Sequence, residues 1–298
     1  MSFLLKAIST LMSVITAAIT ALGIPLGDSM EGHEFPVIGI EQKADDAIRV
    51  MSFNVRCTDV GGNPAINRRL IVLEEILKAA PDSLGLQEAT PQWMTWLGTL
   101  EDYGIVGEGR DGGKLGEHCP VLYNKTKYKL IDSDTFWLSE TPDKVSFGWD
   151  AACRRVCTWA LLEDINTGLR YVHVNSHFDN AGIKAVPEEA KQIAKFIKDK
   201  FSNIPVVFTA DMNTQRDSEA YRIMTAQLSD ARETAPDCKS FGTYHDAKPE
   251  EHTDDIIDYI LYSESVTPLI YRTVTDGIDG RFVSDHFPIY ADVKIEQK

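Results

Sequence analysis

Polar residues that interrupt or end short apolar runs constrain this chain more than any other feature of its sequence. Five runs of strand length each contain or end at a carboxylate, an amide or a histidine. A buried polar group is costly unless it is paired or bound to a metal, so five such insertions need a common explanation. The side chains concerned are those of Asn54, Glu88, Asp211 with Asn213, Asp258, and Asp285 with His286.

Taken singly, each of these residues has a simpler interpretation. One Asn or Asp in a strand is more often a turn or bulge residue than a catalyst, and His177 on an alternating strand is more often a partly buried histidine. Taken together, they offer the oxygen ligands that hard cations prefer and the base and charge stabilisers that phosphate hydrolysis requires. The set as a whole therefore favours a shared chemical role.

Helical and strand periodicities alternate from residue 47 onward. Residues 66–80 carry apolar side chains at helical spacing and stop at Pro81, and Thr90 before Pro91 is typical of a helix N-cap. Residues 171–178 alternate as a strand does. The other predicted elements are strands at residues 48–55, 84–87, 205–210, 256–262 and 288–295 and a helix at residues 187–201. This mixture predicts an α/β or α+β layered fold in one domain, residues 46–298.

The first 45 residues stand apart from that domain. Lys6 is the only charged residue before Asp28, and residues 1–26 are otherwise apolar with interspersed Ser and Thr. They resemble a secretory signal, with a membrane anchor, a membrane-surface helix or an artificial extension as alternatives. Residues 27–45 lack periodicity and are interpreted as a linker. We expect a secreted or periplasmic protein if residues 1–26 are a signal; otherwise we expect a cytoplasmic protein, or a membrane-associated one if they are retained as an anchor.

The net charge of the chain limits which kinds of partner it can bind. With 45 acidic and 30 basic residues the net charge is −15, and lysine and arginine form no basic run. Such a surface repels a phosphodiester backbone, so tight binding to nucleic acid is disfavoured. The five cysteines include no CxxC pair and fit no zinc framework; their odd number leaves at least one thiol free, and a disulfide stays open as an alternative.

Six short segments match, in order, the motifs of a known superfamily. They are Ser-Phe-Asn-Val at 52–55, Leu-Gln-Glu at 86–88, Asn-Ser-His-Phe-Asp at 175–179, Ala-Asp-Met-Asn at 210–213, Ile-Asp-Tyr-Ile at 257–260 and Ser-Asp-His-Phe-Pro at 284–288. On these motifs the chain resembles the endonuclease/exonuclease/phosphatase, or DNase I-like, superfamily. The resemblance implies a four-layer α/β sandwich, in which helices flank two central, mostly antiparallel β-sheets and the site lies at one edge.

The resemblance also implies which residues bind the metal and activate water. Glu88 would be the main ligand of Mg²⁺ or Mn²⁺, with Asn54 and Asp285 assisting it. Asp211 would orient or deprotonate the attacking water, and Asn213 would hold that water or the phosphate.

Two histidines and a third aspartate complete the implied site. His177 and His286 would donate hydrogen bonds to the phosphoryl oxygens as charge builds there, and Asp258 would fix the tautomer of His286. Together with the metal, these groups would stabilise an in-line displacement at phosphorus.

Segments between residues 107 and 160 resemble a largely uncharacterised bacterial branch of the superfamily. They include Gly-Glu-Gly-Arg-Asp-Gly at 107–112, Trp-Leu-Ser-Glu-Thr-Pro at 137–142 and Arg-Val-Cys-Thr-Trp at 155–159. The residues of this region that could line a substrate pocket are Arg110, Glu117, Trp137, Trp149 and Arg155. The alternative is that the tryptophans only pack the core or a lid.

The chain departs from the family pattern at three places, one of which is Cys57, where an aromatic residue is common. Ala-Asp-Met-Asn replaces the usual Gly-Asp-Phe-Asn at residues 210–213, which keeps both polar groups. Val186 stands near a position where the bacterial branch often has an arginine, so the substrate specificity of this chain is expected to differ.

The leading hypothesis is a metal-dependent phosphoric ester hydrolase that uses Mg²⁺ or Mn²⁺. It would act on a phosphomonoester or phosphodiester of a small molecule or a lipid headgroup. A nuclease is the alternative, which the acidic charge disfavours. A catalytically inactive binding module is a third hypothesis, and the complete set of eight site residues speaks against it.

Overall fold

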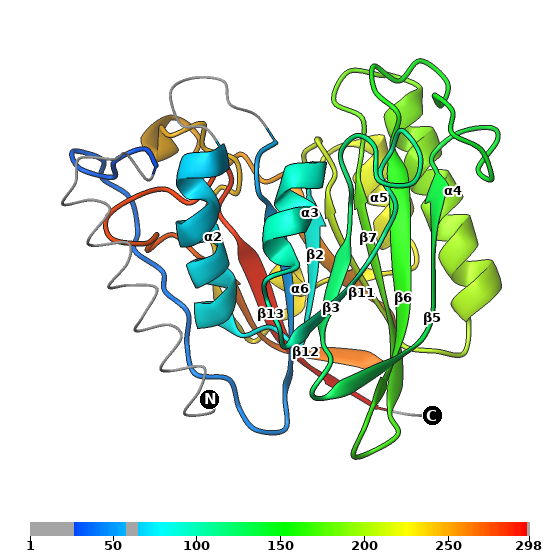
Figure 1. The fold of residues 1–298 in the computed structure, drawn as a ribbon, viewed down its shortest axis with the longest axis horizontal. Helices are drawn as coiled ribbons and strands as arrows, with labels where there is room; N and C mark the ends of the chain where they lie inside the picture. Colours follow the sequence, from blue (N-terminus) through cyan, green and yellow to red (C-terminus); the bar gives the residue numbers. More distant parts are fainter. Residues whose placement is uncertain (1–26, 58–64, 297–298) are drawn as a thin grey trace.

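Two β-sheets packed face to face form the centre of the molecule in the computed structural model, which describes residues 27–57 and 65–296. One sheet has seven strands in the order β10-β12-β13-β1-β2-β4-β3, and the other has six in the order β5-β6-β7-β8-β11-β9. Helices lie outside both sheets, as Figure 1 shows. The strands are β1 (Ile48–Asn54), β2 (Ser83–Gln87), β3 (Tyr103–Val106), β4 (Val121–Asn124), β5 (Tyr128–Trp137), β6 (Val156–Asp164), β7 (Arg170–His177), β8 (Val206–Asp211), β9 (Ser229–Asp230), β10 (Asp237–Lys239), β11 (Asp258–Tyr262), β12 (Val266–Thr273) and β13 (Ile289–Ile295).

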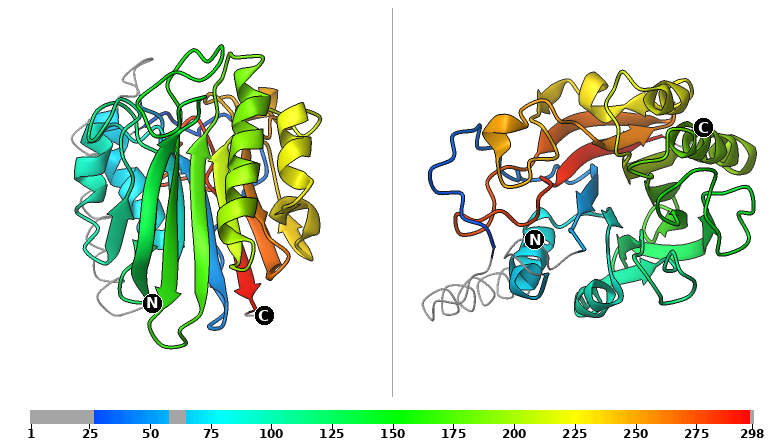
Figure 2. Two further views of the ribbon diagram at one scale, coloured as in Figure 1. Left: turned by 90° about the vertical axis from the view of Figure 1, so that its right-hand side faces the viewer. Right: turned by 90° about the horizontal axis from the view of Figure 1, so that it is seen from above.

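The helices form the two outer layers. Apolar residues of α2 (Ala65–Ala79) and α3 (Pro91–Leu97) pack with residues of β1 and β2 in one buried cluster. Those of α4 (Ala185–Phe201) and α5 (Glu219–Thr225) pack with residues of β7 and β8 in another. Two shorter helices, α6 (Ala231–Thr234) and η2 (Pro249–Glu251), complete the fold. The layers are seen from two further sides in Figure 2, and the predicted four-layer sandwich is confirmed.

Strand direction places the ends of the predicted strands at common edges. Within the sheets, β1 runs parallel to β2, β7 to β8 and β10 to β12, and the other pairs are antiparallel. The mostly antiparallel character expected of both sheets is therefore confirmed. Because β11 and β13 run against β8 and β1, their first residues lie beside the last residues of those strands.

The local signals in the sequence act where they were expected. Helix α2 ends at Ala79, Ala80 adopts a positive φ of 45°, and Pro81 follows. The hydroxyl of Thr90 accepts a hydrogen bond from the backbone N–H of Trp93 at 3.4 Å, which caps α3. The alternating residues 171–178 form β7, and both of its faces are buried because it lies between the other sheet and α4.

Residues 27–45 lie against the domain, although the sequence pattern suggested a linker. They contain neither helix nor strand, apart from an isolated bridge at Ser29. Ile38 is buried and exchanges 2.8 Å hydrogen bonds with Thr275, while the carboxylate of Glu41 accepts two hydrogen bonds of 3.0 Å from Arg272. The segment therefore shares in the domain's packing; the boundary at residue 46 stays a prediction.

The signal or anchor expected at residues 1–26 falls outside the described residues. Among the residues that are described, no helix is both long and apolar enough to cross a membrane. All five cysteines are unpaired, with Cys119 and Cys157 buried.

A buried polar layer joins the two sheets near one edge. The Asn175 side chain on β7 accepts hydrogen bonds from Gln87 at 2.8 Å and Thr209 at 2.9 Å, and donates to the carbonyl oxygens of Leu86 at 2.7 Å and Pro120 at 3.0 Å. Every hydrogen-bonding group of this amide is thus used between the sheets. Such fully satisfied networks rigidify and specify the packing of a core.

Because Gly85 on β2 has no side chain, the polar layer has room to form between the sheets. A Cβ atom at Gly85 would lie 2.0 Å from the hydroxyl of Thr209 and 2.4 Å from the side-chain oxygen of Asn175. A larger residue would therefore push the sheets apart at the point where they are hydrogen-bonded.

We predict that Asn175→Ala lowers the free energy of unfolding by about 2–4 kcal/mol, because it leaves several buried donors and acceptors without partners. Urea denaturation monitored by circular dichroism measures the change. The matched control is Asn203→Ala, which removes an exposed amide in the turn after α4. Equal stability of the two variants would contradict the structural role of the polar layer.

Candidate active site

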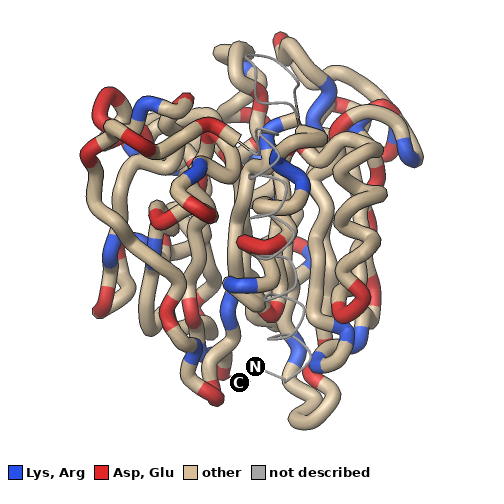
Figure 3. The backbone as a smooth tube through the Cα atoms, turned by 60° about the vertical axis from the view of Figure 1, so that its left-hand side comes forward, with Lys and Arg blue, Asp and Glu red and all other residues tan. Residues whose placement is uncertain are grey.

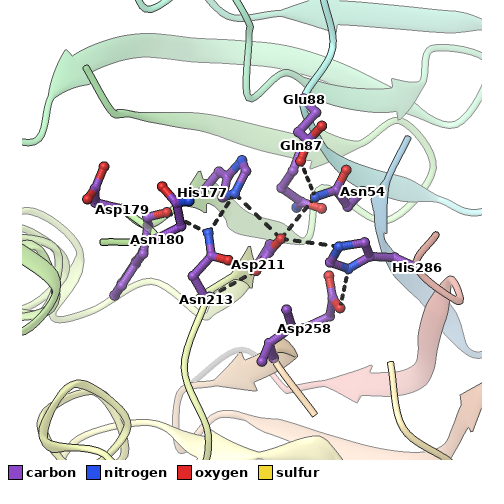
Figure 4. A network of polar contacts seen from close by, with 12 residues as sticks. Asn54, Gln87, Glu88, His177, Asp179, Asn180, Asp211, Asn213, Asp258 and His286 are labelled. Atoms are coloured by element: carbon purple, nitrogen blue, oxygen red, sulfur yellow. Dashed lines mark hydrogen bonds and ion pairs between the residues drawn. The ribbon is translucent and has the colours of Figure 1, made fainter. Parts of the chain in front are cut away.

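The predicted site residues gather at one edge of the sandwich because they occupy the ends of paired strands. Asn54 is the last residue of β1, and Glu88 follows β2 directly. His177 and Asp211 end the parallel strands β7 and β8 and are partners in the ladder. On the antiparallel side, Asp258 begins β11 opposite Asp211. Asp285 and His286 precede β13, and the network that results is drawn in Figure 4.

The amide of Asn54 connects carboxylates from the two sheets. Its Nδ2 donates to Oε1 of Glu88 at 3.1 Å and to Oδ2 of Asp211 at 2.9 Å. Its Oδ1 accepts from the backbone N–H of Arg56 at 2.9 Å, and its carbonyl oxygen accepts from the Ser284 hydroxyl at 2.7 Å. Asn54 is completely buried, so these bonds fix how Glu88 and Asp211 face each other.

His286 lies between two aspartates. Nδ1 of its ring is 2.9 Å from Oδ2 of Asp258, and Nε2 is 3.8 Å from Oδ2 of Asp211. Because a carboxylate can only accept, Nδ1 carries the proton. Burial alone would lower the pKa of His286, but the charge and hydrogen bond of Asp258 raise it to about 10. The ring is therefore a cation at neutral pH and can donate from Nε2.

His177 and Asn213 form the opposite side of the network. Nδ2 of Asn213 lies 2.9 Å from Nε2 of His177, and the backbone N–H of Asn213 donates to Oδ1 of Asp211 at 2.9 Å. Burial, and then the positive charge of Arg155, hold the pKa of His177 well below its usual value. The two histidines thus differ in charge state: His177 is neutral and His286 is protonated.

Two site residues have unusual backbone conformations. Glu88 has a φ of 61° and Asn213 a φ of 49°, a region that residues other than glycine seldom adopt. Such strain persists where surrounding structure over-determines it, and it is concentrated at functional sites. Here Glu88 follows β2 directly and its side chain contacts Asn54, and the Asn213 side chain contacts His177.

The distribution of charge in the site suits a bound cation. Burial, and then the neighbouring charge of Asp258, raise the pKa of Asp211 to about 7. In addition, Oδ1 of Asp258 is buried without a hydrogen-bond partner among the described residues. Excess negative charge on oxygen donors is what a hard divalent cation neutralises, so the donor set fits Mg²⁺ or Mn²⁺.

Two groups of residues could hold that cation. Ligand atoms of Asp211, Asp258 and His286 all lie within 4.8 Å of one another, whereas the motifs implied Glu88, Asn54 and Asp285. The protonated His286 ring already supplies positive charge to the first group and has no lone pair free for a metal. We therefore favour Glu88 as the main ligand, and the hydrogen bonds that its carboxylate accepts from the backbone N–H of Cys57 at 2.7 Å and from Nδ2 of Asn54 at 3.1 Å favour its charged form.

The five residues predicted to bind substrate differ in their surroundings. Arg110 and Glu117 form a partly buried ion pair of 2.8 Å, and the charges of Arg110 and Arg155 both influence His177. Trp137 is buried and donates from Nε1 to the carbonyl oxygen of Arg110 at 2.8 Å, which holds the Arg110 loop. Trp149 is partly exposed at the turn after residue 148. Substrate binding by these residues stays a prediction.

Residues to which the sequence analysis gave no role also support the site. Gln87 and Thr209 bond to Asn175, and Ser284 bonds to the carbonyl oxygen of Asn54. Asp179 accepts hydrogen bonds from four backbone N–H groups, at residues 152, 153, 181 and 182. The available signal was the motifs themselves: Gln87, Asn175, Asp179 and Ser284 belong to them, and Thr209 directly precedes one.

Comparison with known proteins identifies the family. A model of the endonuclease/exonuclease/phosphatase family matches residues 51–286, and the chain belongs to this family. No curated protein sequence matches the chain. Members of this family are phosphoester hydrolases with a DNase I-like fold, and the chain is one of them.

Solved structures agree with this assignment. An endonuclease/exonuclease/phosphatase from Bacteroides vulgatus is 34% identical, with a TM-score of 0.80 over 84% of this chain and 99% of that one. A mannosyl-6-phosphatase from Bacteroides thetaiotaomicron is 29% identical, with a TM-score of 0.77 over 83% of this chain and 99% of that one. D. rerio TDP2, complexed with a single-strand DNA product, is 19% identical, with a TM-score of 0.66 over 84% of this chain and all of that one, and shows likeness of fold alone.

We predict that His286→Ala and Asp258→Asn are non-additive, because Asp258 acts through the His286 ring. His286→Ala should lower kcat by roughly a hundredfold or more, and the double variant should be no slower. In Asp258→Asn the pKa of His286 should fall, so the high-pH limb of the kcat profile should move to lower pH. Two defects that simply multiply would contradict the pairing.

Proposed function

We propose that the chain is a divalent-metal-dependent phosphomonoesterase that acts on a small phosphorylated molecule. The observation that carries the proposal is the meeting of Glu88, Asp211, Asn213, His177 and the His286–Asp258 pair at one edge of the sandwich. The mannosyl-6-phosphatase among the similar structures supports a phosphorylated small molecule as substrate. Mg²⁺ or Mn²⁺, held by Glu88 with Asn54 and Asp285, would supply Lewis-acid stabilisation of charge on the phosphoryl oxygens.

Asp211 is suited to accept the proton of the attacking water. A carboxylate with a pKa of about 7 is ionised in part at neutral pH and is a stronger base than an ordinary aspartate. The backbone N–H of Asn213 holds Oδ1 of Asp211, and Nδ2 of Asn54 holds Oδ2. Both oxygens are thereby oriented before substrate arrives, which lowers the entropic cost of reaction.

The two histidines are suited to stabilise the charge that develops at phosphorus. The His286 cation can donate from Nε2 to a phosphoryl oxygen, and Asp258 keeps the ring in the required orientation. Nε2 of the neutral His177 ring accepts from Nδ2 of Asn213, so this ring can donate to a phosphoryl oxygen only from Nδ1. The two rings thus contribute unequally: His286 donates as a cation and His177 as a neutral ring.

The charge of the molecule favours small substrates over nucleic acid. Acidic and basic positions are interspersed over the part of the chain drawn in Figure 3, and the net charge is −15. Proteins that bind long nucleic acids without sequence preference use a continuous basic groove along the backbone. Arg110 and Arg155 are each paired with a carboxylate, of Glu117 and Asp179, so neither offers a free charge to a polymer.

We predict hydrolysis of small phosphomonoesters in the presence of Mg²⁺ or Mn²⁺, and loss of this activity with EDTA. Glu88→Gln should keep its thermal transition and lose most activity at limiting Mg²⁺, because a neutral amide binds a hard cation less well. The matched control is Glu101→Gln, which changes an exposed residue.

The same assay should include single- and double-stranded oligonucleotides at two salt concentrations. Preference for oligonucleotides that weakens steeply with salt would contradict a small-molecule esterase and assign a nuclease. Full activity of Glu88→Gln would contradict the role of Glu88, and binding without turnover of any phosphoester would leave an inactive binding module.

A further inference from the structure

A cavity of about 270 Å³ opens beside the catalytic residues, on the side of His177 and Asn213. It lies between the segment that joins β7 to α4 and the segment that joins β8 to α5. Its lining includes Asn180, Ile183, Val186, Asn213, Thr214 and Glu219. In Figure 4, Asn180 and Asn213 lie on the side of the network away from Asp258 and His286.

One wall of this cavity is held in place by buried charge. The Asp179 carboxylate accepts from the N–H groups of Ala181 and Gly182 and from two backbone N–H groups of the neighbouring loop, and it pairs with Arg155 at 3.4 Å. Asp150 accepts from two N–H groups at the start of α4, at residues 184 and 185. The wall is therefore built before any ligand binds, as a specificity site requires.

The polar groups on the lining have unused hydrogen-bonding capacity. The amide oxygen of Asn180 accepts from Arg155 at 3.3 Å, and neither N–H of that amide has a partner among the described residues. The Thr214 hydroxyl is also without one in that part of the chain. Glu219 is exposed and 3.7 Å from Lys191. Donors, a hydroxyl and a carboxylate thus face one small space.

Apolar groups form the rest of the lining. Ile183 is 90% exposed, although isoleucine side chains are usually buried in folded proteins. Val186, which also lines the cavity, is partly buried. None of the lining residues, all of which belong to the described part of the chain, is aromatic. A nucleobase is normally held by stacking on an aromatic ring, and this cavity offers none.

From this lining we propose that the cavity binds the leaving group of the substrate and that this leaving group is a sugar. The proposal rests on the phosphomonoesterase function proposed above. One sugar ring suits a cavity of this size, its hydroxyls suit the amides and the carboxylate, and its C–H face suits Ile183. The carboxylate of Glu219 accepts from hydroxyls and repels a second phosphate, which disfavours nucleoside polyphosphates.

The reaction is hydrolysis of a sugar phosphate monoester. Water attacks phosphorus, a new P–O bond forms, and the bond between phosphorus and the ester oxygen of the sugar breaks. Asp211 takes one proton from the water and later releases it to solvent, and the departing sugar oxygen takes a proton from solvent to become a hydroxyl. The products are inorganic phosphate and the free sugar, so no oxidant or other co-reactant is needed.

The test compares two kinds of substrate with the full chain and Mg²⁺. Mannose 6-phosphate and glucose 6-phosphate place a ring in the cavity, and methyl phosphate has a leaving group too small to fill it. Val186→Trp fills the cavity and should lower kcat/KM for the sugar phosphates about tenfold or more, with less than about threefold change for methyl phosphate. Glu219→Gln should raise KM for the sugar phosphates and leave kcat nearly unchanged.

One control and one further cavity variant keep the outcome interpretable. Asp199→Asn changes an exposed charge near the far end of α4 and should affect neither substrate. Ile183→Ala changes an exposed position where folding is not at risk. It should lower kcat/KM for the sugar phosphates and leave that for methyl phosphate unchanged. Equal loss for both kinds of substrate, or no loss in any cavity variant, would overturn the leaving-group site. A wild type that hydrolyses no monoester would instead contradict the proposed function on which the site rests.

Discussion

The site depends on the way the two sheets are joined at one edge. Glu88 comes from the seven-stranded sheet and Asp211 from the six-stranded sheet, and the Asn54 amide donates to both. Just below, the Asn175 amide uses all of its hydrogen-bonding groups between the sheets. Unpaired, these buried groups would each be costly; paired, they fix the distance between two carboxylates that the chemistry requires. Stability and catalytic geometry therefore rest on the same buried polar layer.

Much of the fold followed from the sequence because its signals are local. Short apolar runs, the alternation at residues 171–178 and helical spacing placed the six predicted strands and two predicted helices, and the N-cap at Thr90 and the stop at Pro81 act as local chemistry requires. Strands β3, β4, β5, β6, β9, β10 and β12 were not predicted. β5 is an edge strand with many exposed polar residues, so its sequence lacks the apolar alternation that marks a buried strand. The packing of residues 27–45 was also missed, since isolated contacts such as that of Ile38 have no period.

The site was predictable in composition and less so in arrangement. Each predicted residue stands at the end of a strand, and strand ends meet where neighbours run parallel or start opposite each other. What the sequence could not supply is long-range: the need for Gly85 appears only once Thr209 lies against it. The opposite charge states of His177 and His286 likewise depend on Asp258 and Arg155, which approach from other strands. The cavity beside Asn213 is formed by two segments that are separate in the sequence, so no local pattern predicts it.

The most direct test of the central claim is a crystal structure of the chain with Mn²⁺ and inorganic phosphate, with the metal located by its anomalous scattering. We expect one strong peak beside the Glu88 carboxylate, and the phosphate between that peak and the side chains of His177 and His286. A metal bound only by Asp211, Asp258 and His286 would contradict the assigned ligands. Absence of any peak at this edge of the sandwich, in crystals that diffract well, would contradict a metal-dependent phosphoesterase.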